Sequence, residues 1–143
     1  MIKVVVDAMG GDRSPGANVE GSLQALREMK DVYVILVGDL KQINPLLEGK
    51  EYDKDRLELV DAPEVIGYDE APTLEVFRKK DSSMMRSINI LKENDDVVGM
   101  VSLGNSGAVL AGASIKIGKI PGVKRACFCP LLPTMKRGIV CGY

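Results

Sequence analysis

The sequence predicts an α/β fold of three layers, in which helices cover both faces of a mostly parallel sheet. Apolar segments of strand length alternate with segments of helical periodicity along most of the chain. The residues are 45% hydrophobic but only 4% aromatic, with no Trp, so the core must consist of aliphatic side chains, as is typical of helices on a parallel sheet. At 143 residues and without a linker or repeat, we expect one α/β domain spanning residues 1–143.

The first part of the chain predicts three strands and two helices. Strands are expected at residues 2–8, 32–37 and 56–60, and helices at residues 18–29 and 40–47. The first helix is indicated by apolar residues at three- and four-residue spacing, namely Val19, Leu23, Leu26 and Met29. Pro45 weakens the centre of the second helix. Residues 61–73 contain two prolines and a glycine without periodicity, so we expect an irregular loop.

The second part continues the same alternation. Asp81 or Ser82 can cap a helix that runs to about residue 94, and residues 97–102 form the next expected strand. Residues 106–117 predict a helix of small residues. Beyond it, residues 125–132 and 137–141 could pair as a terminal β-hairpin connected by residues 133–136.

Charge is distributed unevenly along the chain. All 20 acidic residues precede residue 97, whereas residues 97–143 carry six bases and no acid. This cationic third fits an anionic ligand or an acidic partner, although solvated surface lysines would look the same. The absence of histidine excludes a Ser-His-Asp or Cys-His mechanism and a histidine metal site within these residues. A reaction in which inorganic phosphate is the nucleophile suits that absence, because phosphate is already ionised and mainly needs positioning.

Two glycine-containing loops follow predicted strands and lead directly into helices. Residues 7–15 contain Gly10 and Gly11, which allow the backbone to approach a ligand closely. Residues 104–108 place Asn105 or Ser106 as the cap of a helix, whose free amides and dipole form a site for phosphate or an oxyanion. Because the carboxyl ends of parallel strands share one edge, both loops should meet at one cleft.

Each loop taken alone could be an ordinary strand-to-helix turn. Neither the dinucleotide fingerprint G-x-G-x-x-G after the first strand nor the P-loop G-x-x-x-x-G-K-[ST] is present, which disfavours both nucleotide functions. A third candidate for holding an anion is the cationic segment at residues 78–83, just before a predicted helix. Such charge runs are more often solvated surface.

Four motifs in order resemble those of the PlsX family of phosphate acyltransferases. VVDAMGGD at residues 5–12, followed by Pro15, resembles the family's opening signature. KKDSSM at residues 79–84, GNSGA at 104–108 and PLLPT at 130–134 resemble three further family segments, with Ser106 where threonine is usual. Family members are more than twice this length, so the resemblance identifies the chain as their amino-terminal part.

The resemblance implies a fold related to isocitrate-dehydrogenase-like and phosphotransacetylase-like enzymes. It also implies a cytoplasmic homodimer that can associate with the membrane surface, with no metal or organic cofactor and no nucleic-acid partner. The implied reaction converts an acyl-acyl carrier protein thioester and inorganic phosphate into acyl phosphate for phospholipid synthesis. Acyl carrier protein is acidic, which would give the cationic third its partner.

The sequence thus yields a set of expected site residues. Asn105 and Ser106 are the expected catalytic donors. The expected phosphate- and substrate-binding residues are Asp7, Gly10, Gly11, Asp12, Lys80, Ser82, Gly104, Gly107 and Ala108. Because carboxylates repel phosphate, we expect Asp7 and Asp12 to hold the loops by accepting backbone N–H bonds. The alternatives are a phosphotransacetylase-like enzyme that uses acyl-coenzyme A, and a non-catalytic module that binds acyl carrier protein.

Overall fold

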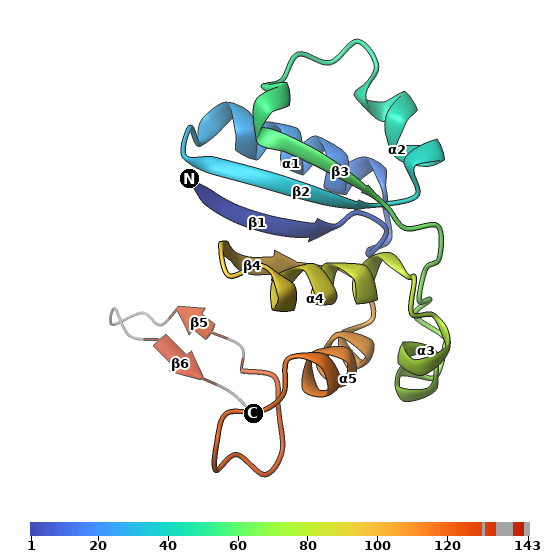
Figure 1. Cartoon of the computed structure of the whole chain (residues 1–143), viewed down its shortest axis with the longest axis vertical. Coiled ribbons are helices and arrows are strands. Elements are labelled where there is room, and N and C mark those ends of the chain that lie inside the picture. The colour runs from blue at the N-terminus through green and yellow to red at the C-terminus, as the bar shows by residue number, and fades with distance from the viewer. Residues whose placement is uncertain (130, 134–138, 142–143) are drawn as a thin grey trace.

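A four-stranded parallel sheet forms the centre of the molecule (Figure 1). The computed structural model describes residues 1–129, 131–133 and 139–141. The sheet has the strand order β3-β2-β1-β4, with β1 at Ile2–Asp7, β2 at Val32–Gly38, β3 at Leu57–Asp61 and β4 at Val97–Val101. All three neighbouring pairs are parallel. The predicted parallel sheet is therefore confirmed.

Helices cover both faces of this sheet. In β2, Val32, Val34 and Leu36 pack with α1 (Gly16–Glu28) and α2 (Leu40–Leu47). The alternate residues Ile35 and Val37 belong to a second core that includes Ile90 and Leu91 of α4 (Ser83–Glu93). Successive side chains of a strand point to opposite faces, so α1 and α2 lie on one face and α4 on the other. The three-layer prediction is confirmed.

Two more helices extend this layer: α5 (Ser106–Lys116) packs against α4, and α3 (Pro72–Arg78) packs against α5. Both share a core of buried residues with α4. The helix α3 was not predicted, since its residues fell in or just after the expected loop. It is only seven residues long, and Leu74 and Phe77 are exposed while Val76 is buried. So short an apolar face gives little periodic signal. Pro72, at the first helical position, was nevertheless a signal that a helix could begin there.

The other differences from the predicted elements are small. Helix α1 begins at Gly16 instead of residue 18, which places Asn18 inside the helix. The third strand begins at Leu57, because Lys54–Arg56 forms a short 3-10 helix, η1.

The terminal hairpin is confirmed in a shorter form. Strands β5 (Leu131–Pro133) and β6 (Ile139–Cys141) pair antiparallel and are drawn away from the main sheet in Figure 1. Residues 125–129, which were expected to belong to the first hairpin strand, lie outside any strand. The expected connection spans residues 133–136, but Pro133 is the last residue of β5, and residues 134–136 lie outside the described residues.

A buried arginine joins α1 to the sheet. Arg56 is 6% exposed, and its guanidinium donates to the carbonyl oxygens of Leu26 (2.6 Å), Met29 (2.8 Å) and Val32 (3.1 Å). Its Nε donates to the Asp53 carboxylate at 2.7 Å. The guanidinium thereby satisfies carbonyls at the end of α1, where intrahelical donors run out.

The described part of β4 has a neighbour on one side only, β1. Its residues Val98 and Val101 are exposed. Among the described residues, none of the helices combines the length and the apolar character needed to cross a lipid bilayer.

Candidate active site

The order of the strands creates a crevice at the carboxyl edge of the sheet. From β1 the chain moves outward through β2 to β3 and then returns to place β4 on the opposite side of β1. The loops after β1 and β4 therefore leave neighbouring strands toward opposite sides. Ligands of open α/β sheets bind at such a switch point. We call residues 8–15 the β1 loop and residues 102–105 the β4 loop.

The two loops touch through glycine. A Cβ atom on Gly10 would lie 2.6 Å from the backbone nitrogen and 2.9 Å from the Cα of Gly104. No side chain fits at that distance, so the close approach requires glycine. Gly11 has a φ of 108°, and a Cβ there would lie 3.1 Å from Cβ of Leu103. The sequence-based expectation that these loops share one edge is correct.

A buried carboxylate bonds to both loops. Asp7 is 2% exposed; one carboxylate oxygen accepts the Met9 N–H at 3.2 Å, and the other accepts the Ser102 hydroxyl at 2.7 Å. The Ser102 oxygen in turn accepts the Gly104 N–H at 3.2 Å. Asp7 thus holds the two loops together, accepting one backbone N–H as expected and a serine hydroxyl in addition. Asp12, by contrast, is exposed.

Asn18 shapes the β1 loop from within α1. It is buried, and its Nδ2 donates to the carbonyl oxygens of Gly10 at 2.6 Å and Ala8 at 2.8 Å, with a longer contact to Asp7 at 3.4 Å. The sequence does not reveal this role, because the pattern predicts only that a helix begins at Asn18. One signal was available: Asn18 adjoins the apolar positions of an amphipathic helix. An amide side chain buried there needs hydrogen-bond partners.

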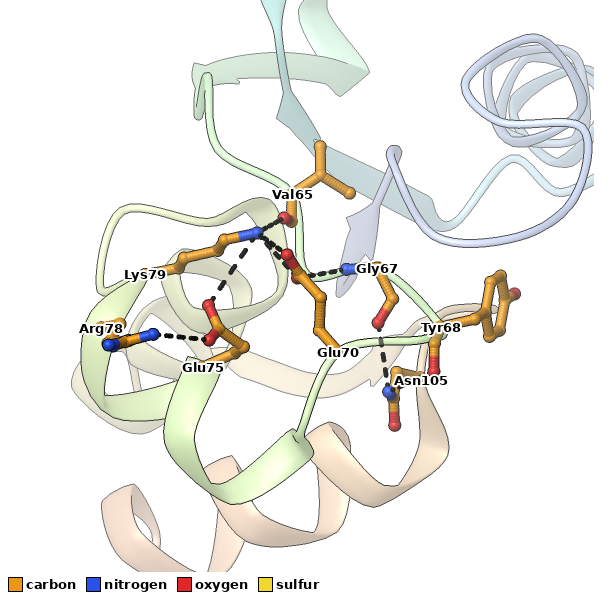
Figure 2. Close-up of polar contacts among 8 residues, drawn as sticks. All are labelled: Val65, Gly67, Tyr68, Glu70, Glu75, Arg78, Lys79 and Asn105. Carbon is orange, nitrogen blue, oxygen red and sulfur yellow. Dashed lines mark hydrogen bonds and ion pairs between the residues drawn. The ribbon is translucent and has the colours of Figure 1, made fainter.

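The β4 loop ends at the amino terminus of α5. The buried Asn105 is the N-cap, and its Oδ1 accepts the Ala108 N–H at 3.1 Å. Its Nδ2 donates to the carbonyl oxygen of Gly67 at 3.2 Å (Figure 2) and to that of Tyr68 at 3.3 Å. The next residue, Ser106, is exposed. Asn105 is therefore fixed in place at both ends of its amide, while the Ser106 side chain faces outward.

An ion pair holds the segment whose carbonyl oxygens accept hydrogen bonds from the Asn105 amide. Lys79 donates to both carboxylate oxygens of Glu70, at 2.6 and 2.7 Å, and to the carbonyl of Val65 at 2.8 Å (Figure 2). Glu70 also accepts the Gly67 N–H at 2.8 Å. The Lys79 ammonium, and then the Gly67 N–H, hold the pKa of Glu70 below its ordinary value. We call residues 64–70 the bridging segment.

Lys80 and Ser82 occupy different surroundings. Ser82 is fully buried and caps α4. Its Oγ accepts a hydrogen bond from the backbone nitrogen of Met85 at 3.4 Å. Lys80 is exposed and lines a surface pocket with Asp81 and Arg86, which contains no residue of the β1 or β4 loops. Within the cationic segment at residues 78–83, Lys79 donates hydrogen bonds to residues of the bridging segment. The start of α4 is nevertheless near the site, since Met84 Cε lies 3.0 Å from a Cβ placed on Gly104.

Gly107 and Ala108 pack the start of α5 against its neighbours. A Cβ on Gly107 would lie 3.0 Å from Cγ of Pro72 at the start of α3, and Ala108 is completely buried. These two residues thus set the position of the α5 amino terminus. Among the described residues, no group of three or more His, Cys, Asp or Glu side chains is arranged to hold a metal ion.

The described cations of the acid-free third lie at the other end of α5. Lys116 is the last residue of that helix, and Lys119, Lys124 and Arg125 are exposed and follow it. An 11-residue helix is about 16 Å long at 1.5 Å per residue, so the carboxyl end of α5 lies about that far from the β4 loop at its amino terminus.

An open parallel sheet whose glycine loops meet at the switch point defines the class of open α/β proteins, which bind their ligands at the carboxyl edge of the sheet. The chain belongs to the fatty acid synthesis protein family, whose sequence model matches residues 2–141. This confirms the resemblance carried by the four motifs.

Similar proteins carry the name phosphate acyltransferase. One from Clostridium tetani (strain Massachusetts / E88) is 40% identical over 132 residues, which cover 92% of this chain and 39% of the relative. One from Clostridioides difficile (strain 630) is 38% identical over 96% of this chain and 40% of the relative. One from Dictyoglomus thermophilum is 42% identical over 94% of this chain and 39% of the relative. The chain spans about two fifths of the length of these relatives.

Proposed function

We propose that this chain is the phosphate-binding, amino-terminal part of a phosphate acyltransferase, formed as a single α/β domain. The observation that carries the proposal is the contact of Gly10 with Gly104 at the switch point, which brings the β1 loop to the amino terminus of α5. The name of the relatives supplies the chemistry, an acyl transfer that involves phosphate.

Phosphate binds, in this proposal, at the start of α5. The first amides of a helix have no intrahelical acceptor, and Asn105 takes up only that of Ala108. The amides of Ser106 and Gly107, with the positive end of the helix dipole, remain for an anion. The exposed Ser106 hydroxyl adds a side-chain donor. Gly10 and Gly11 add no side chains of their own to the opposite wall.

Asn105 and Ser106 have different roles in this proposal. Ser106 contacts phosphate or the oxyanion, which makes it the catalytic residue. Asn105 acts as a positioning residue, because both ends of its amide are already bonded within the protein. It fixes the start of α5 relative to the bridging segment.

The proposed reaction is attack of a phosphate oxygen on the carbonyl carbon of an acyl-acyl carrier protein thioester. A carbon–oxygen bond forms and a tetrahedral oxyanion develops, which the helix amides stabilise. The carbon–sulfur bond then breaks, and the thiolate leaves with the carrier protein and takes a proton from solvent. Phosphate enters already ionised, so the step requires positioning more than a histidine base.

The remaining parts of the proposal concern the partners and the setting. The exposed Lys119, Lys124 and Arg125 suit an acidic acyl carrier protein. We propose a cytoplasmic homodimer that contacts the membrane surface peripherally and supplies acyl phosphate for phospholipid synthesis, without a metal or organic cofactor.

Acyl phosphate formation, trapped as the hydroxamate with hydroxylamine, tests this function. We would compare acyl-acyl carrier protein with acyl-coenzyme A as donors, for this chain and for the full-length Clostridium tetani relative. Turnover with carrier protein, lost in Ser106→Ala or its aligned variant but kept in a Ser114→Ala control on the same helix, is the expected result. Turnover with acyl-coenzyme A alone would select the phosphotransacetylase-like alternative. Carrier protein binding without product from either protein would select a non-catalytic module.

A further inference from the structure

A second, apolar pocket lies beside the candidate site. It has a volume of about 280 Å³ and lies between α4, β4 and α5. Ile88 and Leu91 of α4, Met100 of β4, and Val109 and Ala113 of α5 supply its hydrocarbon walls. Ile117 lines it as well, beyond the last residue of α5.

The single polar residue of this pocket connects it to the candidate site. Ser102 lines the pocket and also donates to the Asp7 carboxylate at 2.7 Å. Its oxygen accepts the N–H of Gly104, which touches Gly10. One end of the pocket therefore lies at the β4 loop, where we place phosphate.

The lining decides which kind of ligand fits. The Ser102 hydroxyl is already occupied by Asp7 and Gly104, so the pocket offers hydrocarbon without a free polar partner. A nucleotide or sugar would lose hydrogen bonds to water there, whereas an aliphatic chain would not. The volume is near the lower limit for small-molecule sites, which suits a narrow chain.

We propose that this pocket holds the aliphatic chain of the acyl substrate, with the carbonyl carbon at the Ser102 end. The inference rests on the proposed function, and it adds where the chain lies. Phosphate at the start of α5 and an acyl carbon beside Ser102 meet at the β4 loop, which both groups border. The pocket also excludes water from the part of the substrate that does not react.

Methionine methyl groups give a direct test with the chain itself. Met100 lines the pocket, whereas Met29 is exposed at the end of α1 and serves as an internal control. In protein labelled at the methionine methyl carbons, we expect nuclear Overhauser effects between decanoate and Met100 and none to Met29. Affinity should rise roughly threefold to fourfold per added methylene from hexanoate to decanoate.

Paired variants separate pocket binding from general effects. Ala113→Leu fills the pocket and should weaken decanoate binding at least tenfold, while Ala17→Leu on an exposed position of α1 should leave it unchanged. If Ala113→Leu does not fold, the Overhauser pattern and the chain-length series still decide. Equal Overhauser effects at Met29, or an affinity independent of chain length, would overturn the proposal. So would concentration-dependent self-association that covers Met100 and excludes decanoate.

The outcome is distinguishable from that of the proposed function. Decanoate bound at Met100 without acyl phosphate formation would support the pocket and count against the function. Turnover by the chain with decanoate contacting residues outside the pocket would do the reverse.

Discussion

The most sensitive point of the site is the contact between Gly10 and Gly104, and Gly10→Ala tests it. The added methyl carbon would lie 2.6 Å from the Gly104 nitrogen, whereas ordinary van der Waals contact begins at 3.4 Å. The loops would have to separate by about 0.8 Å, the difference between these distances. Neither atom can yield independently, because the Gly104 atoms belong to the backbone and Asp7 and Asn18 hold the β1 loop.

Overpacking of this kind costs about 1–3 kcal/mol. We therefore expect Gly10→Ala to lower the free energy of unfolding by that amount in urea denaturation followed by circular dichroism. Gly21→Ala in α1 is the matched control, because a Cβ there meets nothing within 4 Å. It should stabilise the protein by up to about 1 kcal/mol, since alanine is the better helix former. Equal unfolding free energies for Gly10→Ala and the wild type would refute the close contact.

Three further changes probe the surroundings. Arg56→Ala leaves buried carbonyls without a donor and should destabilise the fold by about 1–3 kcal/mol in urea, while Lys54→Ala, at an exposed neighbour, should have little effect. Glu70→Gln should reduce stability at pH 7, because the stabilisation from the lowered Glu70 pKa is fully present above the ordinary value of 4.5. The difference from the wild type should shrink as pH falls below 4.5 and through the lowered pKa, and a difference that stays constant with pH would contradict this. Asn105→Ala removes a helix cap and should cost about 0.5–2 kcal/mol. In the full-length relative the aligned change should lower kcat sharply with little effect on the acyl donor KM, and an unchanged kcat would contradict the positioning role.

The sheet and the meeting of the two loops could be predicted from the sequence. The periodicity of apolar residues predicts strands and long helices, and parallel strands bring their carboxyl ends to one edge of the sheet. Gly10 and Gly104 could therefore be placed together before their contact was known.

The surroundings of the loops could not be predicted, because they depend on contacts distant in sequence. Asn18 reaches back to the β1 loop only because α1 packs against β1, and no local pattern encodes that. The bridging segment has no periodicity, and its shape comes from the Lys79–Glu70 ion pair and from Asn105. Lys79 and Lys80 are neighbours of the same type, so no sequence signal distinguishes the lysine that forms the ion pair from the one that does not.

Titration of the isotopically labelled chain with inorganic phosphate tests the central claim most directly. If phosphate binds at the switch point, the amide resonances of Ser106, Gly107, Gly10 and Gly11 should shift together and saturate with one affinity. Shifts confined to the cationic residues after α5, around Lys119, Lys124 and Arg125, would contradict the proposed site.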